Sequence, residues 1–378
     1  MRRHNSHLPN WGEHIEMTKT KQKPVVRRIQ KIDVSILLGL YKLRALSTDQ
    51  IRRRYNLKPA YVYKKLEILR NTGWIITEPI SGYTNKQRRQ GSYHRISETG
   101  ITCLKKQGYP VERVADDLRV NKRFLPYLLS ANDIFVDLEP FGWTMQDSRE
   151  VKRKYNMNRG DSLQGIFTSP KNKEYIFYVL KESTTERTLA KIAKEIESHS
   201  KVDRMQTNRP TSNYIIFVRG QKSYEQVVNT FYNDKDVLTT TQQLKVMPSV
   251  FAKMYFRLFY DEVELINYLI YHGISDVTRQ VFPKLTKSYK GLSTIVKHKG
   301  NEKYLLNLLD SDLIKIHDVH SYRKEQYQLD GKKILAITTN ALLKKHQEML
   351  RSIKHIDWYP IDHHEIIDYL NEVTPTSK

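Results

Sequence analysis

Residues 47–73 constrain the fold more than any other stretch, because they contain start and stop signals for two consecutive helices. Ser47 and Gln50 have the spacing of a capping box, in which each side chain bonds the backbone N–H of the other residue. The first helix is expected to end near Tyr55. Pro59 suits the first position of the second helix, since proline lacks the N–H that would remain unpaired there. The stretch therefore predicts a helix, a short turn and a second helix.

The second helix, expected over residues 59–70, has one apolar and one polar face. Val62, Leu66 and Leu69 recur at spacings of four and three residues, which places them on one buried stripe. The residues on and beside the opposite face are available to a partner molecule. The candidate binding residues of this helix are Lys58, Ala60, Tyr61, Tyr63, Lys64 and Lys65.

A basic hairpin is expected directly after this helix. Residues 74–77 and 92–96 have strand-like composition, and the loop between them is polar, basic and bracketed by glycines. Helix, turn, helix and hairpin together predict a winged helix-turn-helix, a layout that many proteins use to bind DNA. Winged helices also dock onto proteins, which is the alternative interpretation. The candidate DNA-binding residues of the hairpin are Lys86, Arg88, Arg89 and Arg95.

The distribution of charge favours double-stranded DNA as the partner. The chain has 64 Lys+Arg and 41 Asp+Glu, a net charge of +23. Residues 1–123 contain 27 basic and 10 acidic residues, net +17, so the remaining 37 basic and 31 acidic residues contribute only +6. Each Lys or Arg that contacts a phosphate displaces condensed counterions, so a concentration of positive charge is expected where DNA is bound.

Three motifs around this segment are similar to a known family. They are Tyr-Lys-Leu-Arg-Ala-Leu-Ser-Thr-Asp-Gln-Ile at 41–51, Leu-Arg-Asn-Thr-Gly-Trp-Ile at 69–75 and Tyr-His-Arg-Ile-Ser-Glu-Thr-Gly at 93–100. The clear resemblance covers about residues 32–110, and the family is the replication-relaxation family of bacterial plasmid and mobile-element proteins. It implies a role in replication initiation or mobilisation. The expected protein partners are a second copy of the chain or replication and relaxosome proteins.

The fold class expected for the whole chain is α+β, in four segments. Residues 1–30 are a basic arm, either disordered or ordered along DNA, and residues 31–110 are the winged helix. Residues 124–260 alternate strand and helix patterns, which predicts a small α/β domain. Residues 261–378 are a mixed helix and strand region suited to assembly, with a helix expected at 304–309 and a second winged helix as an alternative. No sequence repeat is evident.

The middle domain contains a partial match to a nuclease pattern. Asp161, two strands and Lys181 are similar to the acidic residue, strand and Glu-x-Lys arrangement of restriction-endonuclease-like nucleases, whose carboxylates hold Mg²⁺. Val179 occupies the position of the second carboxylate, and Glu182 would project to the opposite strand face from Lys181. The domain is therefore expected to be a degenerate nuclease scaffold or an unrelated α/β domain. No catalytic residue is expected.

Other reactive residue types suggest no cofactor or metal. His363 and His364 are adjacent, so on a helix they point about 100° apart and cannot form the i, i+4 pair of a zinc helix. With His346 and His355 they are expected to be polar surface residues. Cys103 is the one cysteine, expected to be a core residue, and it leaves no intramolecular disulfide, which favours a reducing cytoplasm.

The sequence predicts a cytoplasmic bacterial protein, associated with a plasmid or the nucleoid, that binds specific double-stranded DNA. No apolar run reaches the roughly 18 residues of a membrane span, so no membrane partner is expected. The expected role is replication initiation or mobilisation of a plasmid or other mobile element. A winged-helix transcriptional regulator is the first alternative, and a metal-dependent nuclease is the second.

Overall fold

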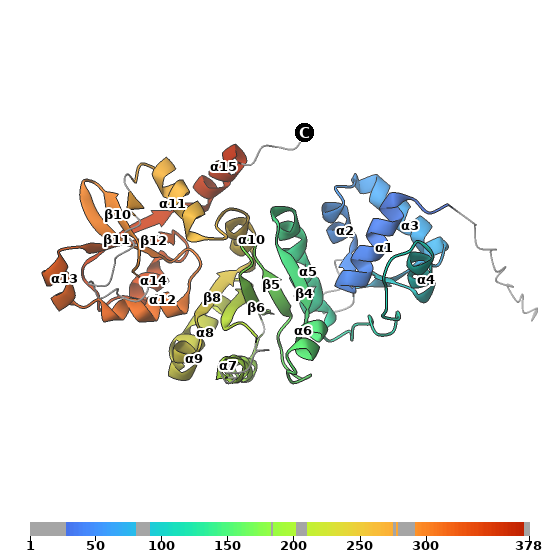
Figure 1. The fold of residues 1–378 in the computed structure, drawn as a ribbon, viewed down its shortest axis with the longest axis horizontal. Coiled ribbons are helices and arrows are strands. Elements are labelled where there is room, and N and C mark those ends of the chain that lie inside the picture. The colour runs from blue at the N-terminus through green and yellow to red at the C-terminus, as the bar shows by residue number, and fades with distance from the viewer. Residues whose placement is uncertain are drawn as a thin grey trace, which may run out of the picture.

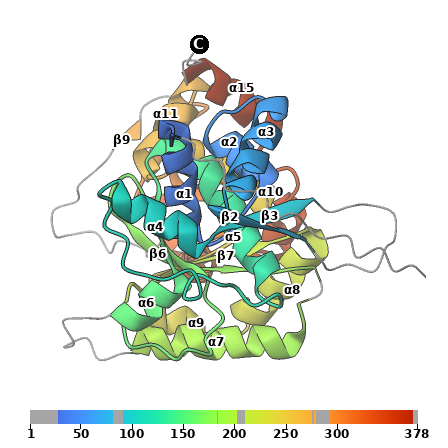
Figure 2. The ribbon, with the colours of Figure 1, turned by 90° about the vertical axis from the view of Figure 1, so that its right-hand side faces the viewer.

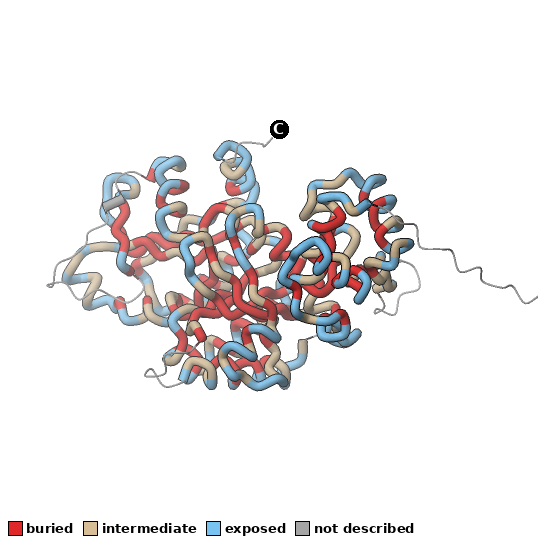
Figure 3. The backbone as a smooth tube through the Cα atoms, turned by 45° about the vertical axis from the view of Figure 1, so that its right-hand side comes forward, coloured by how far each residue is buried: buried red, intermediate tan, exposed pale blue. Residues whose placement is uncertain are grey.

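Three β-sheets follow one another along the molecule in chain order (Figure 1). The structure is a computed structural model, and it describes residues 28–80, 91–182, 184–201, 210–274, 277–278 and 292–373. Helices surround the sheets, so the chain is an α+β protein, as predicted. Buried residues are concentrated in the strands in the middle of the molecule (Figure 3). No helix of the described ranges is long and apolar enough to cross a membrane.

The first sheet belongs to residues 31–106, where the order of elements follows the local sequence signals. Its strands are antiparallel, in the order β1-β3-β2. The predicted capping box is present: Gln50 N donates to Ser47 Oγ at 3.2 Å, and Ser47 N donates to Gln50 Oε1 at 2.9 Å. The elements are α1 (Lys31–Leu43), β1 (Leu46–Ser47), α2 (Thr48–Arg54), α3 (Pro59–Asn71), β2 (Ile75–Pro79), β3 (Ser92–Ile96) and α4 (Glu98–Lys106).

The middle sheet has five strands in the order β4-β5-β6-β7-β8. β5 is antiparallel to both of its neighbours, β4 and β6, and β6, β7 and β8 are parallel. The strands are β4 (Thr144–Asp147), β5 (Gly165–Thr168), β6 (Glu174–Val179), β7 (Asn213–Val218) and β8 (Gln243–Pro248). The helices are α5 (Leu125–Leu138), α6 (Ser148–Lys154), α7 (Glu186–Lys201), α8 (Gln221–Tyr232), α9 (Lys235–Thr240) and α10 (Ser249–Leu258), with a 3₁₀ turn at Glu139–Phe141.

Successive residues of β6 face different helices, because side chains alternate along a strand. Phe177 and Val179 belong to the apolar cluster that contains residues of α5 and α10. Tyr178 and Leu180 belong to the cluster formed with α7 and α8. The sheet therefore has α5 and α10 on one face and α7 and α8 on the other.

The C-terminal sheet also has five strands, in the order β13-β12-β11-β10-β9. Its strands are β9 (Val277–Thr278), β10 (Ile295–His298), β11 (Asn301–Asn307), β12 (Lys333–Thr339) and β13 (Ile356–Ile361). Its helices are α11 (Glu262–Tyr271), α12 (Leu313–Asp318), α13 (Lys324–Asp330), α14 (Leu343–Met349) and α15 (His363–Val373), with a 3₁₀ turn at Val319–Ser321.

Two expectations for this region are wrong. In place of the helix expected at residues 304–309, residues 304–307 belong to strand β11, whose Leu305 and Leu306 are buried between β10 and β12. A strand covered on both faces has a continuous apolar run, which periodicity alone does not distinguish from a buried helix. The alternative of a second winged helix is also wrong, because the described residues of this region form a five-stranded sheet.

The two five-stranded sheets repeat one topology, which no sequence repeat indicated. In both, two antiparallel pairings precede two parallel ones. Leu180 N donates to Phe217 O at 2.8 Å in the middle sheet, and Leu308 N donates to Ile337 O at 2.8 Å in the C-terminal sheet. The last strand of each sheet contains a proline at an equivalent place. Pro248 of β8 pairs with Val218, and Pro360 of β13 pairs with Thr338.

The loop after β11 joins the two sheets by covering the edge of β8. Val246 N donates to Ser311 O at 3.3 Å, and Leu244 N donates to the Asp312 carboxylate at 3.1 Å. Lys245 Nζ lies 2.9 Å from the Asp310 carboxylate in a buried ion pair. These contacts satisfy edge groups that would otherwise be left unpaired.

Helix α5 joins the N-terminal unit to the middle sheet. The Asn132 side chain is fully buried, and its Nδ2 donates to Leu43 O at 3.1 Å and to Ala45 O at 2.7 Å. Arg53 of α2 forms ion pairs with Asp133 and Asp137 of α5. Because α5 also packs on the middle sheet, the N-terminal unit has a defined place against that sheet.

We predict that Asn132→Ala destabilises the chain, because two buried carbonyl groups lose their common donor. The expected loss is about 1–3 kcal/mol in the free energy of unfolding. Chemical denaturation of the full chain measures it, and Asn229→Ala, at an exposed position of α8, is the matched control. Equal stability of the two variants would contradict the role given to Asn132.

Candidate nucleic-acid interface

The outer face of α3 is exposed where the sequence predicted it. Tyr61 is 44% and Tyr63 66% exposed. Val62 and Leu69 are completely buried on the opposite face. The other candidates with exposed side chains are Lys58, Ala60 and Lys64. Helix α3 therefore presents two tyrosines and neighbouring lysines to solvent.

Lys65 does not belong to this surface, although it was a candidate. Its side chain is 2% exposed, and its Nζ lies 2.8 Å from Asp33 Oδ1 of α1 and donates to Gln30 Oε1 at 2.7 Å. Lys65 follows Val62 by three residues, so it lies on the buried face of the helix. Lys65 therefore holds α3 against α1 instead of facing a partner.

The hairpin candidates differ in what the structure says of them. Lys86, Arg88 and Arg89 lie outside the described residues. The Arg95 side chain is 16% exposed, and its Nε lies 3.2 Å from Glu78 Oε1 on the neighbouring strand. A hydrogen bond from Tyr93 and the interaction with Arg95 lower the pKa of Glu78, despite some burial. Arg95 is thus already paired across the hairpin.

His94 connects the hairpin to the start of α2, a role that was not expected from the sequence. Its Nε2 lies 2.9 Å from Thr48 Oγ1, and its Nδ1 lies 3.0 Å from Thr77 Oγ1. Burial, with a smaller effect of Arg70, lowers the pKa of His94 to about 4. The ring is therefore neutral at pH 7 and links α2, β2 and β3 through two hydroxyl groups.

The segment before α5 adds exposed basic residues beside the hairpin. Tyr93 of β3 forms an apolar cluster with Leu125 and Leu129, against which Val120 also packs. This packing brings the exposed Lys122 close enough to affect Glu78 of β2, and the exposed Arg123 follows it in the chain. These residues belong to none of the four segments expected from the sequence, although Arg119, Lys122 and Arg123 form a visible basic run.

The partial nuclease pattern is not assembled into one site. Asp161 Oδ2 lies 3.1 Å from His199 Nε2 of α7. Lys181 Nζ instead lies 4.5 Å from the centre of the Tyr127 ring, which belongs to α5 on the other face of the sheet. Val179 is buried, as expected for an apolar strand residue. The structure therefore separates the two residues that the pattern would bring together.

The expectation of four surface histidines is wrong for two of them. His346 is completely buried, with Nδ1 2.7 Å from Thr338 Oγ1, and His355 is 7% exposed. Asp362, His363 and His364 are more exposed, and one potential ligand atom from each lies within 4.8 Å of the others. Asp362 also accepts a hydrogen bond from His364 N at 2.9 Å at the start of α15. This exposed group alone does not indicate a metal.

No protein-family model, curated protein or solved structure matches the chain. The resemblance to the replication-relaxation family therefore stays a prediction that rests on the three quoted motifs.

Adjacent lysines of α3 provide a matched test of this geometry. We predict that Lys65→Met lowers the free energy of unfolding by roughly 3–5 kcal/mol, because Asp33 remains as a buried, unpaired charge. Lys64→Met, at an exposed position, is expected to change it by less than about 0.5 kcal/mol. Denaturation curves of both variants measure the difference. If Lys65→Met kept its stability and lost DNA affinity, Lys65 would be a binding residue after all.

Proposed function

We propose that the protein binds specific double-stranded DNA of a plasmid or other mobile element through its N-terminal unit. The observation that carries the proposal is the exposed Tyr61, Tyr63 and Lys64 face of α3, in the third of the chain with net charge +17. The proposed role, in the bacterial cytoplasm, is replication initiation or mobilisation, with a second copy or replication and relaxosome proteins as partners.

The order of elements supports this proposal. Helices α1, α2 and α3, followed by the β2–β3 hairpin with β1 as third strand, have the order expected of a winged helix-turn-helix. In that class the second helix of the motif enters the major groove, and here it is α3. Lys65 fixes α3 on α1, so the outer face of α3 is held rigidly and not on a mobile loop.

The chemistry of the exposed residues fits contacts of two kinds. Tyr61 and Tyr63 present hydroxyl groups that can bond base edges, and Lys58 and Lys64 present charges that suit phosphates. Lys122 and Arg123 extend the basic surface toward the hairpin. Lys86, Arg88 and Arg89 are proposed to contact phosphates or the minor groove from the hairpin loop.

We predict that Tyr61→Ala with Tyr63→Ala lowers the discrimination between the natural site and random DNA. Specific base contacts are typically worth roughly 1–3 kcal/mol each, so the specificity ratio is expected to fall at least about tenfold. Titration of site and random duplexes at one fixed salt concentration measures this ratio. Tyr109→Ala, at an exposed position outside α3, is the control. Unchanged specificity in a folded double variant would place base recognition elsewhere.

A winged-helix transcriptional regulator is the first alternative, since it uses the same DNA-binding surface. The position of the bound site separates the two roles. Sequencing of DNA fragments that co-purify with the protein is expected to place the site at a replication or transfer origin. Sites confined to promoters, with a responding reporter and unchanged plasmid copy number and transfer, would favour the regulator.

A metal-dependent nuclease is the second alternative, and we predict that the protein does not cleave DNA. Metal-assisted hydrolysis needs carboxylates that converge with a lysine on one phosphate, whereas Asp161 and Lys181 face opposite sides of the sheet. Purified protein is expected to leave supercoiled plasmid intact in Mg²⁺ or Mn²⁺. Nicking that co-purifies with the chain and disappears in Asp161→Ala, Lys181→Ala would establish the nuclease instead.

A further inference from the structure

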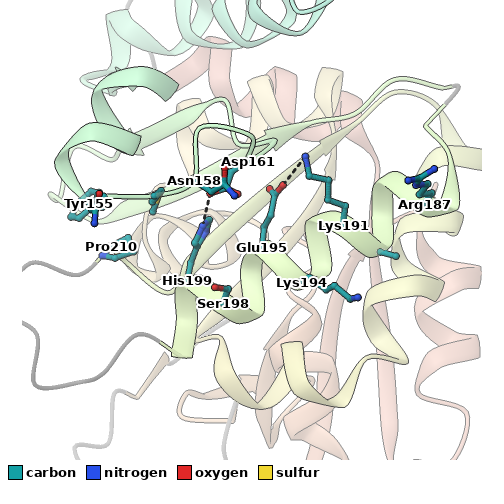
Figure 4. Close-up of a pocket in the computed structure, with 13 residues that line it drawn as sticks. Tyr155, Asn158, Asp161, Arg187, Lys191, Lys194, Glu195, Ser198, His199 and Pro210 are labelled. Carbon is teal, nitrogen blue, oxygen red and sulfur yellow. Dashed lines mark hydrogen bonds and ion pairs between the residues drawn. The ribbon is translucent and has the colours of Figure 1, made fainter.

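A cavity of about 740 Å³ lies between the segment after α6 and one face of α7 (Figure 4). Its volume falls within the range of about 300–1,000 Å³ that is typical of sites for small molecules. In Figures 1 and 2, α7 lies at the bottom of the molecule and α3 near the top. The cavity is therefore separate from the proposed DNA-binding helix.

Three basic residues of α7 line the cavity. Arg187, Lys191 and Lys194 are spaced by four and three residues, so they lie on one exposed face of the helix. Lys191 Nζ donates to Gly160 O at 2.7 Å. The side chains of Arg187 and Lys194 form no hydrogen bond or ion pair with any residue that the structure describes. Two positive charges are thus available to a ligand.

The acidic residues of the cavity, Asp161 and Glu195, already form hydrogen bonds with neighbouring residues. Glu195 is 6% exposed, and its two carboxylate oxygens accept hydrogen bonds from Ser162 N at 2.9 and 2.8 Å. The Asp161 carboxylate is paired with His199 at 3.1 Å. Because these carboxylates have partners, whereas the side chains of Arg187 and Lys194 have none among the described residues, the cavity suits an anion better than a cation.

Polar and aromatic groups complete the wall. Tyr155 and Asn158 line the cavity opposite α7 (Figure 4). The His199 side chain is 9% exposed, and its Nδ1 has no hydrogen-bond partner among the described residues. The Arg187 and Lys194 side chains on α7 can form charge-assisted hydrogen bonds with phosphate oxygens, and Tyr155 and Asn158 add an aromatic ring and an amide to the lining.

We propose that this cavity binds a phosphate-bearing ligand, with Arg187 and Lys194 as the charged contacts. A free nucleotide and a single-stranded nucleic-acid backbone share this chemistry and are the two sources to distinguish. The proposal goes beyond DNA binding by α3 and does not depend on it.

Calorimetric titration of the full chain with pyrophosphate, ATP and a short single-stranded oligonucleotide tests the proposal. Wild-type protein is expected to bind at least one of the three probes. Arg187→Gln with Lys194→Gln is expected to weaken that binding roughly tenfold or more, because two charge-assisted contacts are lost. Lys222→Gln with Lys235→Gln removes the same charge from exposed positions of α8 and α9 and is expected to bind as wild type does.

Each outcome distinguishes the sources or overturns the proposal. Binding of ATP or pyrophosphate identifies a nucleotide-type site, and binding of the oligonucleotide alone identifies a backbone site. Binding of no probe by wild-type protein, or equal binding by the two double variants, would overturn it. Thermal unfolding verifies that the variants are folded. Site-specific duplex binding, measured in parallel, is expected to be unchanged by Arg187→Gln with Lys194→Gln, which keeps this test independent of the α3 proposal.

Discussion

The hydrogen bonds from Asn132 to the carbonyls of Leu43 and Ala45 are the contact on which the relation between the N-terminal unit and the rest of the chain depends. The two carbonyls lie where α1 ends and β1 begins. The buried Asn132 amide therefore fixes the turn between these two elements and also holds it against α5. The ion pairs of Arg53 with Asp133 and Asp137 act beside it. Since α2 leads directly into α3, these contacts also set the direction in which the exposed tyrosines point.

Buried ion pairs recur at the junctions of the molecule. Lys65 pairs with Asp33 between α3 and α1, and Lys245 pairs with Asp310 between the two larger sheets. Burial disfavours both charges, but Lys245 and Lys315 hold the pKa of Asp310 below its usual value. Removing water from two charges offsets much of their attraction, so such pairs add little net stability. Their larger effect is on specificity: if the two elements packed in a different position, one buried charge would be left without its partner.

The parts of the structure that the sequence predicted are those with short-range signals. Ser47, Gln50 and Pro59 mark helix ends through bonds to their own neighbours, and α2 and α3 begin where these residues predict. Lys65 was misplaced although its spacing from Val62 and Leu69 puts it on the apolar stripe, because the partner that allows a lysine to be buried there, Asp33, is distant in the sequence. The cavity was missed for the same reason: Asp161 meets His199 only after β5, β6 and α7 have formed. The repeated sheets escaped detection because they share strand directions and not residue identities.

The prolines that the two larger sheets share at matching positions limit strand pairing at the outer edges of β8 and β13. In β8 the outward N–H groups of Leu244 and Val246 bond the loop after β11, and two residues later Pro248 has no N–H to offer. In β13 the carbonyls of His355 and Ile361 accept hydrogen bonds from the side of β12, so the backbone groups of odd-numbered residues face β12. Because successive residues alternate, those of even-numbered residues face outward, and Pro360 is one of these. A proline there shortens the exposed edge available to another strand. Pro360 therefore weighs against extension of this sheet by another strand along β13.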